Sequence, residues 1–573
     1  MKYQGNPVSK GIAVGEIFLY RPFCPDVAES VIREEDADKE LARYEKGKTA
    51  AGVELEKLTS SLAEHSPDKA KIFQAHLDIL NDVAVHGDIQ KAVRKERASA
   101  DWAVYKVYGR YIDMLLKVKD ELVRERAADM QDVRNRLLRN LQGLPEVNLA
   151  DLGRPVIVAA EDLFPSDTAS LDRKNVLGIV TEVGGATSHT AIIARSYAIP
   201  ALLGVKGLLG MLQNGETVIV DAVDGELMTS PTPEEIAAAQ ARAENWRRKA
   251  EETALYIDKD PVLTDGDRIE VKLNIAGVDQ AELAGARYSD GVGLFRTEFV
   301  YMNGQDLPGE DEQYNIYRKV LLEFGEKPVI LRTLDIGGDK QCPSLDLPQE
   351  ENPFLGKRAL RLCFDLPDVF RTQLRAALRA GVHGNLWIMF PMVASLDDLR
   401  RAKDMLSEAA AELKTEGKDY SKNCKVGIMI EIPSIALIAD AAAKEVDFAS
   451  IGTNDLCQYA LAVDRTNQAI CEYFQMYHPG VLRLIRDVAS AFTAAGKPLS
   501  VCGEMGGDPL AMPLLIGFGI DQLSMGLSAV AQSKKIIRAL SRSKARELAE
   551  KACSLSTTAE VEQYLRGELA EYL

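Results

Sequence analysis

One histidine lies in a segment suited to phosphoryl chemistry. Gly184 and Gly185 permit a tight turn, small residues follow, and an amphipathic run begins at His189. The pattern predicts a helix with His189 in its first turn, where free N–H groups and the helix dipole favour an anion. Neutral imidazole is also a good nucleophile. The segment alone leaves two readings open, a capping or buried histidine and an acceptor of a phosphoryl group.

Carboxylates follow two apolar runs in the C-terminal half of the chain. Glu431 ends one run, and Asn454 and Asp455 end the next. Proteins usually hold Mg²⁺ with a few carboxylates, while water or phosphate completes the shell. A salt bridge to a neighbouring arginine is the alternative role for either carboxylate. The Asn454 amide can hydrogen-bond a phosphate or enol oxygen.

Three arginines and one cysteine are further candidate functional residues in the C-terminal half of the chain. Arg296 and Arg332 each follow an apolar run, and Arg465 lies in a later loop; such guanidinium groups grip phosphate and carboxylate at two points. Cys502 ends a run and precedes glycines. A buried, inert thiol is the common alternative, but a thiol with a pKa of about 8.5 is protonated at neutral pH and can act as an acid. Together, these carboxylates, arginines, the Asn454 amide and the Cys502 thiol indicate a binding site for a small phosphorylated acid.

The elements that must position these residues follow an alternating pattern. Helical patterns separate most of eight short apolar runs, so the region from about 260 to 573 is predicted to form a (β/α)8 barrel. Reactive residues gather where these runs end, as barrel active sites do. The runs are residues 269–276, 291–295, 328–331, 386–390, 426–430, 448–451, 498–501 and 522–525.

The N-terminal half has a different organisation. Residues 29–141 show helical spacing without strand patterns and predict a helical bundle. Strand signals flank this region, so we predict an α/β domain into which the bundle is inserted. A capping box formed by Thr232 and Glu235, with Pro233 between them, predicts an exposed connecting helix that runs to about residue 257. The predicted strands of the α/β domain are residues 11–20, 155–160, 176–181 and 216–221.

The length, net charge and cysteine spacing of the chain exclude some classes of protein. A chain of 573 residues predicts two to four domains. Its net charge of −17 argues against nucleic-acid binding. The eight cysteines form no C-x-x-C pair, which favours a reducing cytoplasm. No signal-type segment or membrane-length apolar run is present in the sequence.

Seven motifs give the chain a resemblance to Enzyme I of the bacterial phosphoenolpyruvate:sugar phosphotransferase system, the phosphoenolpyruvate-protein phosphotransferases. The motifs occur in the family's order, and the resemblance runs over essentially the whole length of the chain. The resemblance implies a swivelling phosphohistidine domain, an inserted helical domain that docks the phosphocarrier HPr, and a phosphoenolpyruvate-binding barrel. The motifs are GGATSH (184–189), GLFRTE (293–298), RTLDIGGDK (332–340), ENPFLG (351–356), IMIEIP (428–433), GTNDL (452–456) and CGEM (502–505).

The resemblance also implies residue roles. His189 would carry the phosphoryl group on Nε2, and Thr168 would hydrogen-bond it. Glu431 and Asp455 would ligate Mg²⁺, and Cys502 would protonate the enolate to pyruvate. Phosphoenolpyruvate would be bound by Arg296, Arg332, Asn454, Asp455 and Arg465.

The implied domains are residues 1–24 with 146–231 (phosphohistidine domain), 25–145 (HPr-binding domain), 232–260 (linker helix) and 261–573 (barrel). A homodimer through the barrel is also implied. Ala186 and Lys357 depart from the common family pattern, in which arginine and tryptophan, respectively, are frequent at these positions.

Three alternatives to this family were considered from the sequence. A pyruvate phosphate dikinase or phosphoenolpyruvate synthase would need an ATP-grasp domain, and the nitrogen-regulatory branch of Enzyme I would need an added sensor domain. The third alternative is a non-catalytic regulatory paralogue.

Overall fold

The computed structural model divides the chain into two compact units, Met1–Ala250 and Glu251–Leu573. It describes the chain apart from residues 22, 24, 26, 64–66, 117–120, 145–148, 150, 151, 164–166, 168–170, 173, 186, 187, 279, 303–305, 339, 341, 343, 346, 348, 349 and 573. For residues 61–63, 67–72, 121–125, 128, 189, 192, 196, 281 and 468 it describes the backbone only.

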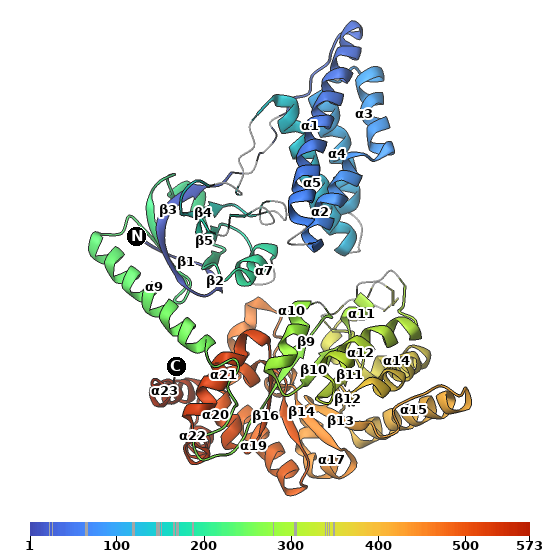
Figure 1. The fold of residues 1–573 in the computed structure, drawn as a ribbon, viewed down its shortest axis with the longest axis vertical. Coiled ribbons are helices and arrows are strands. Elements are labelled where there is room, and N and C mark those ends of the chain that lie inside the picture. Colours follow the sequence, from blue (N-terminus) through green and yellow to red (C-terminus); the bar gives the residue numbers. More distant parts are fainter. Residues whose placement is uncertain are drawn as a thin grey trace. The chain divides into compact units, whose positions relative to one another are not determined.

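Five helices form the predicted bundle in the first unit. They lie side by side around a core that includes Tyr44, Phe73 and Leu137 (Figure 1). Their buried residues recur every three or four positions, which is the spacing of one helix face. The helices are α1 (Ala37–Ala63), α2 (Pro67–Leu80), α3 (Val83–Lys95), α4 (Ala100–Leu116) and α5 (Glu121–Gln142), preceded by the 3₁₀ turn Glu34–Asp36.

The same unit contains an eight-stranded mixed sheet in the order β1-β8-β7-β3-β4-β5-β6-β2. The four predicted strands are confirmed as β3 (Ile12–Leu19), β4 (Val156–Ala160), β5 (Val176–Thr181) and β7 (Thr217–Asp221). The sheet also contains four shorter strands that were not predicted, β1 (Lys2–Gln4), β2 (Asn6–Ser9), β6 (Ala201–Leu203) and β8 (Glu226–Thr229). Among the residues that the structure describes, the helices that accompany the sheet are α7 (His189–Ser196) and α8 (Leu208–Met211).

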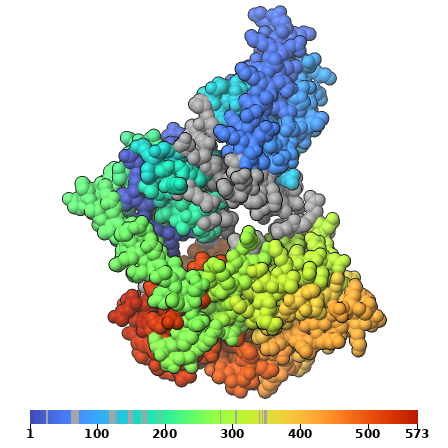
Figure 2. Space-filling model, viewed as in Figure 1, coloured from blue at the N-terminus to red at the C-terminus, as the bar shows by residue number. Residues whose placement is uncertain are grey.

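The predicted connecting helix is α9, Pro233–Ala254, which ends three residues before the expected position. Its capping box is confirmed: the backbone N–H of Glu235 donates to Thr232 Oγ1 at 3.2 Å, and that of Thr232 donates to Glu235 Oε2 at 2.7 Å. Ala239 is the one buried residue of this helix. The helix is therefore exposed along most of its length and stands out as a green ridge (Figure 2).

Eight parallel strands close into a barrel in the second unit, as predicted. The strands keep the expected positions to within a residue or two, and Arg296 and Arg332 end their strands rather than follow them. They are β9 (Glu270–Ile275), β10 (Val292–Arg296), β11 (Pro328–Arg332), β12 (Asn385–Phe390), β13 (Lys425–Ile430), β14 (Phe448–Ile451), β15 (Leu499–Val501) and β16 (Gln522–Met525).

Helices surround this barrel and bury its outer apolar face (Figure 1). Alternate strand residues point inward, and Leu294, Met389, Met429 and Cys502 belong to one interior cluster. The helices are α10 (Gln280–Leu283), α11 (Phe299–Met302), α12 (Glu310–Phe324), α13 (Leu360–Asp365), α14 (Pro367–Ala380), α15 (Leu396–Thr415), α16 (Pro433–Leu437), α17 (Ala439–Glu445), α18 (Thr453–Leu461), α19 (Pro479–Ala494), α20 (Met512–Gly517), α21 (Leu527–Ala539), α22 (Arg542–Ser554) and α23 (Thr558–Glu568).

Short 3₁₀ turns interrupt several connections of the barrel unit. They are Ala284–Tyr288, Pro353–Leu355, Gly381–His383, Gln468–Tyr473 and Glu504–Gly507. Across the part of the chain that the structure describes, no helix is both long and apolar enough to cross a membrane.

Candidate active site at the carboxyl ends of the barrel strands

The strand order brings the predicted reactive residues to one rim of the barrel. Because all eight strands are parallel, their carboxyl ends meet at the same end of the barrel. Arg296 and Arg332 are paired neighbours at the ends of β10 and β11. Glu431, Asp455 and Cys502 follow β13, β14 and β15 within a few residues. The expected grouping at the barrel mouth is therefore present.

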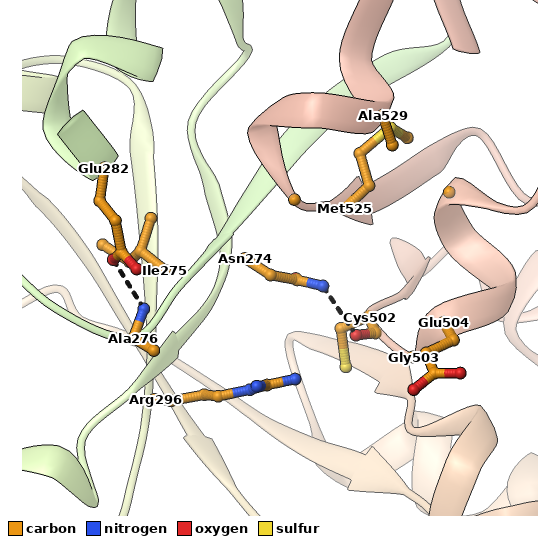
Figure 3. A pocket seen from close by; sticks show the side chains of 12 residues that line it. Asn274, Ile275, Ala276, Glu282, Arg296, Cys502, Gly503, Glu504, Met525 and Ala529 are labelled. Atoms are coloured by element: carbon orange, nitrogen blue, oxygen red, sulfur yellow. Dashed lines mark hydrogen bonds between the residues drawn. The ribbon is translucent and has the colours of Figure 1, made fainter. Parts of the chain in front are cut away.

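A cavity of about 410 Å³ opens at this rim. The guanidinium of Arg296 extends toward the thiol of Cys502 across the cavity (Figure 3). The carboxylate of Glu282 also faces it and accepts the backbone N–H of Ala276 at 2.8 Å. The wall is lined by Asn274, Ile275, Ala276, Glu282, Arg296, Cys502, Gly503, Glu504, Gly507, Met525, Gly526 and Ala529.

Cys502 is a protonated thiol at neutral pH. Only 1% of the residue is exposed, and burial raises the pKa of its thiol to about 11. The side chain of Ser450 and the charges of Arg332 and Arg296 oppose this shift but do not cancel it. The thiol therefore borders the cavity in the form that can give up a proton.

The carboxylate pair fits a divalent cation. Glu431 is fully buried; its Oε1 accepts the backbone N–H of Met392 at 2.5 Å, and its Oε2 has no hydrogen-bond partner among the described residues. Burial, and then repulsion from Asp455 and Asp335, raise the pKa of Glu431 to about 8. A hard cation with oxygen ligands would relieve this repulsion and occupy the open oxygen.

Arg332 is enclosed in a buried ion-pair cluster. It pairs with Glu298, and its Nη1 lies 3.1 Å from Asp335 Oδ2. Lys340 Nζ reaches the same two carboxylates at 2.6 and 2.9 Å. Burial would raise the pKa of Asp335, but the charges of Arg332, Lys340 and Arg358 hold it well below its usual range. Arg332 is thus fixed and charged before any substrate arrives.

Arg358 joins this cluster to the carboxylate pair. Its Nε donates to Asp335 Oδ1 at 2.9 Å, and its Nη1 donates to Asp455 Oδ1 at 3.0 Å. Glu298, Asp335 and Lys340 lie inside the sequence motifs but had no predicted role, and Arg358 was not predicted at all. The available signal was position, since Glu298 and Asp335 each follow a strand by two or three residues.

Asn454 and Arg465 lie beside these groups. Asn454 Nδ2 donates to Glu504 Oε1 at 3.2 Å, which connects it to a residue that lines the cavity. Arg465 Nη2 lies 3.9 Å from Asp455 Oδ1, and its backbone N–H donates to Gln458 Oε1 at 3.0 Å. The structure thus brings all the barrel residues predicted for the site to the same rim.

His189 belongs to the other unit and begins α7, as the sequence predicted. Ser188 caps this helix, since its Oγ accepts the N–H of Ala191 at 3.3 Å, and Gly184 supplies a turn with a φ of +113°. The His189 side chain, Thr168 and Ala186 lie outside what the structure describes. Lys357, the second departure from the common pattern, pairs with Asp365 on the surface.

Comparisons with known proteins identify the class first. Three family models match in chain order: the N-terminal model of PEP-utilising enzymes (residues 4–126), their mobile-domain model (152–225) and their PEP-binding-domain model (250–542). The third alone spans half of the chain and covers the barrel. The fold described above is therefore that of a PEP-utilising enzyme.

Full-length relatives narrow the class to one family. The chain is 43% identical to the phosphoenolpyruvate-protein phosphotransferase of Priestia megaterium, with 98% of each chain covered. It is 41% identical to that of Bacillus subtilis (98% of this chain, 99% of the relative) and 42% identical to that of Geobacillus stearothermophilus (98% and 97%). The chain belongs to the phosphoenolpyruvate-protein phosphotransferase family.

Proposed function

We propose that this chain takes the phosphoryl group of phosphoenolpyruvate onto His189, releases pyruvate, and passes the group to the histidine of a phosphocarrier of the HPr type. This would be the first step of sugar uptake by a phosphotransferase system. The observation that carries the proposal is the placement of Arg296 and Cys502 around one cavity at the carboxyl ends of the barrel strands. Membership of the family supplies the reaction.

Substrate binding follows from the charges at the rim. The phosphate and carboxylate of phosphoenolpyruvate would be held by Arg296, Arg332 and Arg465, with Asn454 at an oxygen. Arg332 needs no reorganisation, because Glu298 and Asp335 already fix its guanidinium. In this arrangement the positive charge is aimed at the substrate before the reaction begins.

Transfer requires a nucleophile and an acid. Nε2 of His189 would attack phosphorus, the bond from phosphorus to the enol oxygen would break, and the enolate would leave. Cys502 would then give its proton to C3 of the enolate, which yields pyruvate and a thiolate. The high pKa of Cys502 supports this role, since the proton is present when the enolate forms.

Enzymes of this family use a divalent metal ion, and we propose that Mg²⁺ is the ion here and that Glu431 and Asp455 hold it. The unpartnered oxygen of Glu431 and the all-oxygen donor pair support this choice. The ion would neutralise negative charge on the phosphate while the protein side chains orient the substrate.

Further parts of the proposal concern domains and partners. We propose that residues 1–24 with 146–231 form the phosphohistidine domain, with Thr168 beside His189. The helical domain, residues 25–145, would bind the HPr-type phosphocarrier. The linker helix, residues 232–260, would connect the N-terminal domains to the barrel, residues 261–573, which would bind phosphoenolpyruvate. A homodimer through the barrels and a cytoplasmic location complete the proposal; the cysteines that the structure describes are free, which supports a reducing compartment.

Labelling with ³²P-phosphoenolpyruvate tests this function. The wild-type chain should be labelled in the presence of Mg²⁺ and should lose its label to added HPr. His189→Ala should take up no label, whereas His383→Ala, a histidine on the barrel unit, should be labelled like wild type. Chelation of divalent ions should stop labelling, and Mg²⁺ should restore it.

Two outcomes would contradict the proposal. Labelling that survives in His189→Ala would reject this histidine as the acceptor. Labelling with no pyruvate produced would reject the coupled reaction and favour a regulatory paralogue.

A further inference from the structure

The main chain of Cys502 is held from two directions. Its N–H donates to the carbonyl of Ile451 on β14 at 3.1 Å. The ladder between β15 and β16 ends at Val501 and Leu523, so the Cys502 carbonyl lies beyond it. That carbonyl instead accepts Nδ2 of Asn274 at 3.0 Å, from β9 on the far side of β16 (Figure 3). A side chain thus replaces the missing ladder bond.

Ser524 fixes the orientation of the Asn274 amide. The Ser524 hydroxyl donates to Asn274 Oδ1 at 2.6 Å, and Nδ2 also lies 3.5 Å from the Ser524 carbonyl. The opposite amide orientation would place Oδ1 against two carbonyl oxygens, which is unfavourable because both are acceptors. The amide is therefore held in the one orientation that donates to Cys502.

Two glycines permit this packing. A Cβ on Gly293 would lie 2.4 Å from Ser524 Oγ, and a Cβ on Gly503 would lie 1.9 Å from Thr453 Oγ1. Neither position could carry a side chain without displacing its neighbour. The residue after Cys502 and the hydroxyl that orients Asn274 are both confined, so Cys502 has little freedom to shift.

We propose that Asn274, oriented by Ser524, is a positioning residue that fixes the direction from which Cys502 delivers its proton. The inference rests on the proposed function, in which the Cys502 thiol is the acid. Neither Asn274 nor Ser524 needs to react; their role is to hold the thiol on one side of the cavity that both Asn274 and Cys502 line.

The consequence is stereochemical. The S–H bond of Cys502 breaks and its proton forms a C–H bond at C3, using the electron pair of the enolate. The C2–O bond becomes a carbonyl, and the negative charge stays on sulfur. An acid fixed on one side protonates one face of the planar enolate. An acid that can shift loses rate, since misplacement by about 1 Å can cost about 10²-fold, and also protonates the other face.

The test uses the full-length chain with phosphoenolpyruvate deuterated stereospecifically at C3, in tritiated water, with the methyl configuration of trapped pyruvate as readout. Wild type should give one configuration. Asn274→Ala should lower kcat about tenfold or more, leave KM within about twofold, and give a mixture of configurations. Ser524→Ala, which keeps the amide but frees its orientation, should show the same change to a smaller degree.

A control variant and a double variant complete the experiment. Ser500→Ala removes a neighbouring interior hydroxyl that donates to the Ala449 carbonyl at 3.4 Å, and it should behave as wild type. The double variant of Asn274 and Ser524 should match Asn274→Ala, because Ser524 acts through the amide.

Wild-type kcat in both single variants would overturn the inference. A lower kcat with one configuration retained would overturn it too, since the thiol would still deliver from one side. Full rate and one configuration in Cys502→Ala would instead reject the proposed acid, whatever Asn274 does.

Discussion

At the scale of single residues, the least expected feature of the site is the number of buried ion pairs around Arg332. Glu298 and Asp335 both pair with it, and Lys340 and Arg358 share these carboxylates. If one partner were removed, a charge would stay buried without full compensation, which strongly destabilises the folded state. The cluster therefore determines the stability of the rim as well as its readiness for an anionic substrate.

Glu298→Gln should destabilise the barrel unit by about 3 kcal/mol at neutral pH, because it leaves Arg332 and Lys340 short of one buried counter-charge. Although burial opposes ionisation, Arg332 and Lys340 hold the pKa of Glu298 below its usual range. The stability from this carboxylate is present above the unfolded-state pKa and lost as pH falls through the lower folded pKa. The difference from wild type should therefore shrink in acid.

Urea unfolding of the full chain at several pH values measures this difference. Glu408→Gln, a matched change on the exposed face of α15, should alter stability by less than about 0.5 kcal/mol. Equal effects of the two changes at neutral pH would show that the Glu298 cluster adds nothing to stability.

The sequence predicted which residues lie at the strand ends better than it predicted the contacts among them. Arg296, Arg332, Glu431, Asp455 and Cys502 were all placed at strand ends by the alternation of apolar runs. Their partners depend on which strands become neighbours and in what register. Asn274 and Cys502 are 228 residues apart in sequence and meet only because the barrel closes.

At the scale of elements, β10 and β16, which both pair with β9, approach each other closely at Gly293. Gly293→Ala should cost about 2–3 kcal/mol, because the new Cβ would meet Oγ and Cβ of Ser524 at 2.4 and 2.5 Å, and Cβ is not a flexible atom. Gly567→Ala on α23 should be neutral or stabilising by up to about 1 kcal/mol, because its new Cβ would meet no described atom within 4 Å outside its own helix and chain neighbours.

Thermal or urea unfolding of the full chain distinguishes the two glycine variants. A wild-type midpoint for Gly293→Ala would mean that the strands separate without cost. If Gly293→Ala folds, it should also reduce the stereospecificity of pyruvate formation, because Ser524 orients Asn274.

The barrel strands were predictable even where they are short, whereas four short strands of the mixed sheet were not. The barrel strands were found because buried parallel strands are continuous apolar runs between helices. β1, β2, β6 and β8 contain only three or four residues each, too few to show an alternating pattern. They are held by pairing with strands far away in sequence, such as β1 with β8.

At the scale of the whole molecule, the proposed acceptor and the proposed substrate site lie in different units, Met1–Ala250 and Glu251–Leu573. The helix α9 runs across the boundary between them. For a tethered group, the effective concentration at its target depends on the length and stiffness of the tether. The proposed reaction therefore depends on α9, although this helix contains none of the proposed catalytic or substrate-binding residues.

Ala241→Pro, at an exposed position inside α9, tests this dependence. Proline removes one helical hydrogen bond and kinks the helix, at a local cost of about 3 kcal/mol. Labelling of His189 by phosphoenolpyruvate should slow severalfold, because the kink changes the reach of the unit that carries His189. The affinity of the barrel for phosphoenolpyruvate, measured by calorimetry, should stay unchanged, because the residues proposed to bind substrate all lie beyond residue 290.

The matched control is Ala241→Ser, which alters the same exposed position but keeps the helix, at a cost of about 0.5 kcal/mol. It should label at the wild-type rate. Wild-type labelling in Ala241→Pro would show that transfer does not depend on an unbroken α9. Weaker phosphoenolpyruvate binding in that variant would show that α9 supports the barrel itself, and the tether argument would then fail.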